Sequence, residues 1–357
     1  MPAPTGFILQ ETLDECELWS IYRGRRHRGQ KTKLFLAFPE DHYPASAIQE
    51  FRYLLESTSG MHGGMLPALE SFDSDGHFVV VFEDWPGAML AEVLGQRRIK
   101  IDEFFIIAKN LATALLALHG HGAVHSALSP HSILVDENGE IRILPFLCPH
   151  ELMGRSGLLH HPEFIERILP YLSPERTGGS GRQTDRRSDQ YSLGAILYRM
   201  LTGITPFQSE DPLELVYSHA MRPPIHPSAL RRDIPSMLSN MVMKLLEKDP
   251  ENRYQGTPGL AADLGRCYTL YEKGAAETVF TLGEGDIPEI FSISGKLYGR
   301  RKETDSIAIV FDGIRRGGKE IINITGPSGI GKTTFVHSII RPLAGIRGLY
   351  IEGKCDQ

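Results

Sequence analysis

The chain has 357 residues, of which 41% are hydrophobic and 23% charged, and its formal net charge is −6 with a pI near 6.2. This composition is typical of a globular protein with room for two domains, and the acidic balance gives no reason to expect nucleic-acid binding. The strongest apolar run, 78–82, is far shorter than the about 20 residues that span a membrane. With no basic-then-apolar N-terminus and no C-x-x-C pair, we expect a cytoplasmic protein.

The first hundred residues predict a strand-rich lobe with one helix. Short β-type runs, separated by polar or glycine-bearing turns, occur at 7–9, 18–22, 33–38 and 78–82. Apolar residues at helical spacing predict a helix over 44–55.

From residue 101 onward the patterns are mainly helical. Asp102 is a candidate N-cap for a helix that continues to residue 118. Two short β-type runs, 132–135 and 141–144, flank a turn and predict a hairpin. Further apolar helices are predicted over 189–201, 234–246 and 258–271.

The last part of the chain changes character. Residues 273–295 carry glycine and acidic residues without helical period, which is typical of a linker. A helix-like segment (302–315), a strand (320–325), a glycine-rich loop and a helix beginning at Lys332 follow.

Residues 125–132, HSALSPHS, resemble the catalytic loop of protein kinases, H-R-D-L-x-x-x-N. Three later segments resemble, in family order, the A-P-E segment, the start of the central helix of the C-terminal lobe and the arginine motif: 171–175, 188–194 and 249–253. The resemblance implies an α+β bilobal protein-kinase-like fold, with a β-rich N-lobe and a helical C-lobe. It also implies a buried Glu175–Arg253 ion pair, and Asp189 as an acceptor of catalytic-loop backbone amides.

The positions that carry kinase chemistry have different residues. Phosphoryl transfer needs a lysine on the third strand, a base and ligands for magnesium. Ala37 stands at the lysine position, Ala127 at the base, Ser132 at the metal-binding asparagine and Pro145 at the aspartate of the D-F-G triad. The segment 14–19 has no glycine and adds negative charge where phosphates would lie. No residue is therefore assigned a catalytic role, and we expect a pseudokinase.

One alternative is an active, divergent serine/threonine kinase that phosphorylates protein substrates with displaced residues. Lys33 lies on the same strand face as Ala37 but about 13 Å away along the strand. Glu50 matches the helix glutamate that would orient a lysine, and Ser132 is a poor metal ligand. A positioned base alone is worth about 10²–10⁴ in rate, so the combined losses argue against catalysis.

A complete G-x-x-x-x-G-K-[ST] motif lies near the C-terminus. Its glycines would let backbone N–H groups surround a β-phosphate, the lysine would reach the β- and γ-phosphates, and Thr333 would coordinate Mg²⁺. The predicted binding residues for ATP–Mg²⁺ are Gly326, Pro327, Ser328, Gly329, Ile330, Gly331, Lys332, Thr333 and Thr334. The short remainder, 335–357, has no room for a second acidic strand, so we expect a fragment of a longer protein or, alternatively, a nonfunctional truncated gene product.

The whole chain resembles the N-terminal part of large hybrid signalling proteins. These carry a serine/threonine-kinase-like domain, an AAA-type (STAND-like) ATPase, a GAF domain and a sensor histidine kinase. The segments that carry the resemblance are 211–219, 262–267, 296–300 and 353–357, together with the glycine-rich loop. It implies a kinase-like domain (1–272), a linker (273–295), the start of a P-loop ATPase domain (296–357), downstream GAF and histidine-kinase domains, and protein partners in signalling, without nucleic acid or membrane.

Overall fold

The computed structural model divides by internal contacts into two units, Met1–Glu289 and Ile290–Gln357. The residues that it describes are 7–25, 31–43, 45–58, 60, 63–146, 162–177, 184–286, 306, 310, 319, 321–327 and 332. The first unit holds nearly all of them, and the architecture below is that of this unit.

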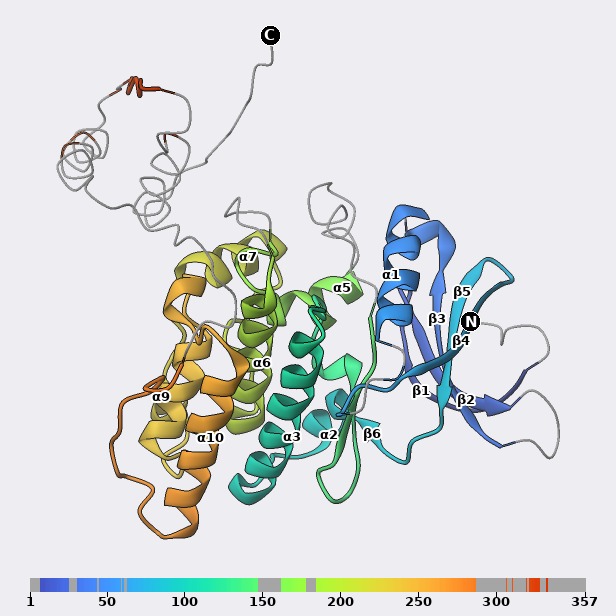
Figure 1. Ribbon diagram of the computed structural model, residues 1–357, viewed down its shortest axis with the longest axis horizontal. Coiled ribbons are helices and arrows are strands. Elements are labelled where there is room, and N and C mark those ends of the chain that lie inside the picture. Colours follow the sequence, from blue (N-terminus) through green and yellow to red (C-terminus); the bar gives the residue numbers. More distant parts are fainter. Residues whose placement is uncertain are drawn as a thin grey trace. The chain divides into compact units, whose positions relative to one another are not determined.

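The N-terminal lobe is one antiparallel sheet with a helix against it (Figure 1). The sheet order is β1-β2-β3-β5-β4. Its elements are β1 (Ile8–Glu15), β2 (Ser20–Arg25), β3 (Lys33–Pro39), the short 3₁₀ turn η1 (Glu40–His42), α1 (Ala45–Ser57), β4 (Ala68–Ser74) and β5 (His77–Glu83). The predicted strands and helix are confirmed, but β4 was not predicted. As an edge strand it is mostly exposed and lacks a β-type apolar run.

The sheet buries both of its faces, because alternate residues of a strand point to opposite sides. Leu34, Leu36 and Phe38 of β3 share a core cluster with Phe51 of α1. The residues between them pack on the other face with Tyr22 of β2. This explains why β3 reads as a continuous apolar run rather than an alternating one.

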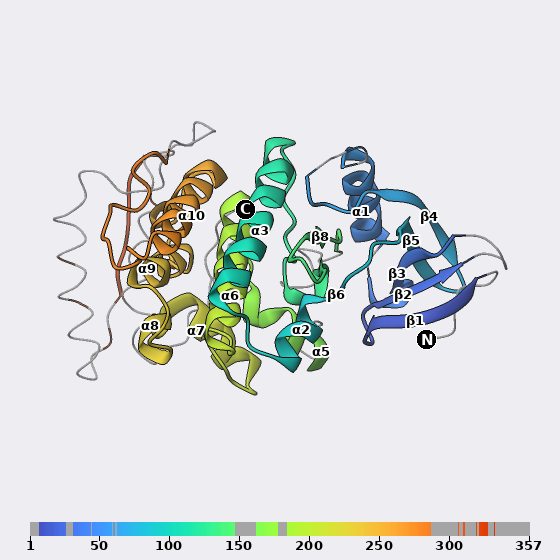
Figure 2. The same cartoon turned by 90° about the horizontal axis from the view of Figure 1, so that it is seen from below.

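The C-terminal lobe is mainly helical, with α3, α6, α9 and α10 packed together (Figures 1 and 2). Its first part contains β6 (Ala88–Met89), α2 (Leu90–Gln96), α3 (Ile101–Gly120), η2 (Pro130–Ser132), β7 (Ile133–Val135) and β8 (Ile141–Ile143). Its second part contains α5 (Pro162–Arg167), η4 (Leu169–Tyr171), α6 (Arg186–Thr202), α7 (Pro212–Met221), α8 (Pro227–Leu230), α9 (Ser236–Leu245), η5 (Pro250–Asn252) and α10 (Thr257–Glu272). The predicted hairpin is the antiparallel pair β7–β8.

The ends of the helices follow from local chemistry. Helix α6 begins after Asp185, whose carboxylate accepts the backbone N–H of Arg187, and ends at Gly203 with φ 85°. The predicted N-cap of α3 is wrong: Lys100 occupies that position, without a side-chain cap. Asp102 lies inside the first turn, where a carboxylate instead complements the helix dipole.

A segment after α10 packs back onto the helical lobe. The Asp286 carboxylate accepts the backbone N–H groups of Gln255 (2.6 Å) and Gly256 (3.0 Å), where α10 begins without a side-chain cap of its own. A Cβ added to Gly259 would lie 2.5 Å from Asp286, so this approach requires glycine. Phe280 is buried beside the Arg266 guanidinium. Residues 273–286 of the expected linker thus contact the kinase-like unit, while 287–295 lie outside the described residues.

Replacing Asp286 by alanine should lower the free energy of unfolding by about 1–2 kcal/mol, because two N–H groups at the start of α10 lose their acceptor. Urea unfolding of the chain measures the change. The matched control is Glu284→Ala, whose side chain is 71% exposed and whose loss should cost less than about 0.5 kcal/mol. Equal unfolding midpoints for the two variants would contradict the capping role.

Candidate functional site

The catalytic-loop region keeps the backbone geometry predicted for it. Oδ2 of Asp189 accepts the backbone N–H of His125, and Oδ1 accepts that of Ser126, both at 2.8 Å. Nε2 of His119 lies 3.0 Å from the same carboxylate. Burial alone would raise the pKa of Asp189, but the hydrogen bond and charge of His119 hold it below its usual value. The prediction that Asp189 anchors this loop is confirmed.

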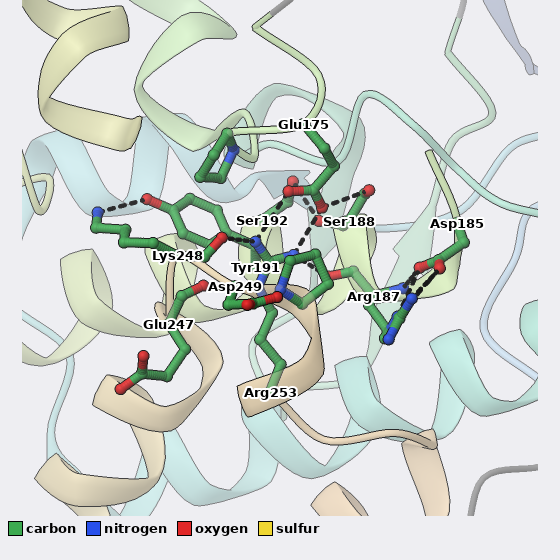
Figure 3. A network of polar contacts seen from close by, with 12 residues as sticks. Glu175, Asp185, Arg187, Ser188, Tyr191, Ser192, Glu247, Lys248, Asp249 and Arg253 are labelled. Carbon is green, nitrogen blue, oxygen red and sulfur yellow. Dashed lines mark hydrogen bonds and ion pairs between the residues drawn. The ribbon is translucent and has the colours of Figure 1, made fainter. Parts of the chain in front are cut away.

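The predicted ion pair between Glu175 and Arg253 is also confirmed. The guanidinium donates from Nη1 to Oε1 at 2.6 Å and from Nη2 to Oε2 at 2.9 Å, a bidentate pair (Figure 3). The hydroxyl of Ser188 donates to the same carboxylate, and the guanidinium also lies over the ring of Tyr191. Burial would raise the pKa of Glu175, but the bond to Arg253 lowers it. The pair joins the segment before α6 to the segment before α10.

The positions that replace the kinase base and metal ligands are enclosed. Ala127 is 1% exposed and Ser132 is 0% exposed. The hydroxyl of Ser132 donates to the backbone oxygen of Ser129 and accepts its N–H, so it closes a capping box around η2. That engagement leaves it poorly placed to bind a metal. Pro145 is buried and has no side-chain donor or acceptor, and Leu147 of the expected D-F-G-like triad lies outside the described residues.

The third strand presents no cation to the lobe interface. Ala37 lies on the sheet face that packs with Tyr22, away from the cluster that contains Ala127. The β3 residues on the interface side are Leu36 and its neighbours two positions away, all apolar and buried. In the structure, the β3 residues that face the lobe interface are therefore the neighbours of Ala37 and not Ala37 itself. A one-residue shift along a strand exchanges its two faces, and a sequence alignment alone could not show which residues face the interface.

Of the three residues considered as substitutes, Ser132 is described above, Lys33 lies apart from the interface, and Glu50 is only partly described. The Nζ of Lys33 is 2.6 Å from Oε1 of Glu83, where the first residue of β3 pairs with the last residue of β5. Glu50 is in α1, and its side chain lies outside the described residues.

The turn between β1 and β2 reaches the C-terminal lobe, which the sequence did not reveal. The carboxylate of Asp14 receives Nη1 of Arg167 at 2.5 Å, Nδ1 of His131 at 2.9 Å and Nε1 of Trp19 at 3.1 Å. Burial would raise the pKa of Asp14, but the hydrogen bond and charge of His131 bring it below its usual value. The only sequence signal was a tryptophan in a turn that carries glycines in active kinases.

Aromatic rings fill the space beneath this turn. Trp19 is 2% exposed, and its ring meets that of Phe146 edge-on with centroids 5.0 Å apart. Phe146 in turn meets Phe38 at 5.9 Å. The cleft side of the sheet is thus joined to the catalytic-loop region by an apolar layer.

Few side chains in the described part of the kinase-like unit have the chemistry that an ATP–Mg²⁺ complex requires at the lobe interface. Within it, no group of three histidine, cysteine or acidic side chains could hold a metal ion. Hydrophobic side chains of both lobes are buried together at this interface. Magnesium prefers carboxylate and other oxygen ligands, and triphosphate needs cations or N–H donors.

The glycine-rich loop is described only in part. Nζ of Lys332 donates to the backbone oxygens of Gly326 (2.7 Å) and Pro327 (2.8 Å), so the ammonium lies beside the first two residues of the motif. This placement fits a phosphate-binding lysine. The other predicted binding residues lie outside the described residues: Ser328, Gly329, Ile330, Gly331, Thr333 and Thr334. Residues 321–327 are not in a strand, and Ile321 is 97% exposed. A strand needs a pairing partner, and none is found among the described residues.

Comparisons with known proteins agree with this architecture. The family model of the protein kinase domain matches residues 33–263, more than half of the chain, and the chain therefore belongs to the protein kinase family. The model of the AAA ATPase domain matches residues 296–357.

Curated relatives match about half of this chain and a smaller share of their own length. Hybrid signal transduction histidine kinase G of Dictyostelium discoideum is 36% identical over 207 residues, which are 52% of this chain and 6% of that protein. Serine/threonine-protein kinase PknB of Mycobacterium tuberculosis is 33% identical over 190 residues, 53% of this chain and 30% of that protein. The chain thus spans less than a third of the length of these relatives.

Solved structures support the fold. The kinase domain of PknI from Mycobacterium tuberculosis superposes with a TM-score of 0.58 at 16% identity, covering 75% of this chain and 98% of that one. At this identity the likeness establishes the bilobal kinase fold. In the described part of the chain, no helix combines the length and apolarity that a membrane crossing requires.

Replacing Arg253 by methionine should lower the free energy of unfolding by about 3–5 kcal/mol, because the buried Glu175 carboxylate would lose its partner. The control is Arg97→Met, which removes the more exposed pair with Glu103 and should cost at most about 1 kcal/mol. Urea or thermal unfolding compares them. If both variants lost the same stability, the buried pair would not be the anchor described above.

Stability should fall steeply in acid. The pKa values of Glu175 and Asp189 lie below their ordinary values of 4.5 and 3.8. Their contribution is therefore complete above those ordinary values and is lost as the pH falls through the lower pKa values of the folded state. The urea midpoint measured between about pH 6 and pH 3 should drop in the lower half of that range. In Glu175→Gln the slope should be shallower, and an unchanged slope would count against this assignment.

Proposed function

We propose that the kinase-like domain is a pseudokinase: a noncatalytic regulatory domain of a signalling protein, which acts by binding protein partners. The observation that carries the proposal is the chemistry of the lobe interface. Apolar side chains occupy the cleft side of β3, and Ala127 and Pro145 stand where a base and a metal ligand would be required. The buried anchors of Asp189 and Glu175 keep the scaffold without these groups.

We further propose that ATP with Mg²⁺ binds at the P-loop, 326–334. The match of 296–357 to the AAA ATPase domain supports this, because such domains generally use ATP and Mg²⁺. The ammonium of Lys332 would hold phosphate oxygens, and the hydroxyl of Thr333 would supply a ligand to the metal. In a longer parent protein, downstream ATPase, GAF and histidine-kinase domains would receive the signal. The name of the Dictyostelium relative, a hybrid signal transduction histidine kinase, supports the last of these.

The second candidate is an active, divergent serine/threonine kinase, which the names of the curated kinase relatives favour. It would need a cation at the triphosphate. Lys33 is the β3 cation, but its ammonium is engaged by Glu83, and it lies on the strand face opposite to Leu36 and Phe38, which share a cluster with Ala127. The geometry therefore favours the noncatalytic reading.

The chain should transfer no phosphate from γ-labelled ATP to itself or to generic protein substrates with Mg²⁺ or Mn²⁺ present. The assay should be repeated with the Lys332→Ala variant, in which turnover at the P-loop cannot deplete the ATP. Metal-dependent incorporation that survives Lys332→Ala and disappears in Lys33→Met would overturn the proposal and support the second candidate.

A further inference from the structure

The turn between β1 and β2 occupies the place from which kinases cover the phosphates of ATP. Here it is fastened to the C-terminal lobe rather than open above a ligand. The Asp14 carboxylate bonds Arg167 of α5 and His131 of η2. The backbone N–H of Glu17 also donates to the carboxylate of Glu163, on α5.

We infer that this turn is a built-in closure of the cleft, which keeps ATP and other adenine nucleotides out of the kinase-like domain. The inference rests on the proposed noncatalytic function and goes a step further. Missing catalytic groups would still permit a nucleotide to bind without reacting, whereas a filled and fastened cleft leaves it no space.

The steric part of the argument concerns Trp19. Its ring is almost fully buried against Phe146, which packs on Phe38 of the sheet. The ring position is fixed further by the bond from Nε1 to Asp14. A nucleotide could enter only if this ring left its apolar contacts, which would expose a large hydrophobic surface to water.

The electrostatic part concerns the cations near the turn. Among the described residues, Arg167 and His131 are basic side chains that the fold brings to this place, and both face the Asp14 carboxylate. A triphosphate would have to compete with that carboxylate for them and would also meet the negative charge of Glu163 beside Glu17. Charge at the turn therefore disfavours the anionic ligand that kinases bind there.

The first experiment separates the two candidate nucleotide sites of the full chain. A methylanthraniloyl derivative of ATP is titrated into Lys332→Ala combined with Trp85→Phe, so that the P-loop lysine is absent and Trp19 is the remaining tryptophan. We expect no energy transfer from Trp19 to the nucleotide at millimolar concentrations. Saturable transfer would overturn the closure.

The second experiment tests the fastening by acrylamide quenching in the Trp85→Phe background. Trp19 should be quenched weakly, and Asp14→Asn should raise its quenching constant several-fold because the ring and the turn lose their shared acceptor. The matched control on the same strand is Glu11→Gln, which removes an exposed pair with Arg23 and should leave quenching unchanged. Equal quenching in all three proteins would overturn the role of Asp14.

The third experiment measures hydrogen exchange on the unaltered chain, so its result does not depend on whether a variant folds. The amides of Cys16 and Glu17 donate to Trp19 and Glu163, so they should exchange slowly, and Mg²⁺–ATP should not change their rates. Fast exchange, or protection by ATP, would overturn the closure. Such a result without phosphate transfer would leave the proposed pseudokinase function intact, so the failures of the two proposals are distinguishable.

Discussion

The carboxylate of Asp189 is the interaction on which the rest of the kinase-like unit depends. It lies at the start of α6, accepts two backbone N–H groups of the catalytic-loop region and contacts His119 of α3. The other ring nitrogen of His119 lies 2.8 Å from the hydroxyl of Thr257, at the beginning of α10. One buried anion thus connects three helices and the loop, and its desolvation is offset only because each of its contacts is a donor. The loop keeps its shape for this reason.

In the proposed pseudokinase, the groups that hold the fold together are separate from the positions of kinase chemistry. The groups that hold the fold together are buried and mutually satisfied: Asp189 with its amides, and Glu175 with Arg253. The groups that would hold a nucleotide must instead remain unsatisfied by the protein and open to the cleft. At those places the chain has apolar residues or, in Ser132, a hydroxyl already used in a capping box. Apolar side chains at the lobe interface remove the cost of keeping unpaired polar groups there, so the proposed noncatalytic role and the packing of the interface are physically consistent.

The sequence predicted the two lobes, the main helices and both buried anchors, because these depend on local periodicity and on motifs with fixed spacing. Three features needed the structure. The face of β3 that carries Ala37 could not be read from an apolar run without alternation. The contacts of Asp14 with His131 and Arg167 join residues more than a hundred positions apart. The packing of 273–286 against α10 depends on the Asp286 carboxylate, which caps the start of that helix from about thirty residues further along the chain. From composition alone, this segment is typical of a linker.

The segment that ends at Asp286 and the end of β1 that carries Asp14 use the same physical device. Each is fixed by one carboxylate bonded to several donors: backbone amides at the start of α10 in the first case, and side chains of α5, η2 and the β1–β2 turn in the second. In both, the donors would otherwise be unpaired at a partly buried place, so the carboxylate gains more than a surface ion pair provides. The first fixes the point at which the chain leaves the kinase-like unit, and the second fixes the lobes against each other. A partner that binds across the lobes would therefore meet a preformed surface and would lose little conformational entropy on ordering it, which suits a domain whose proposed role is binding.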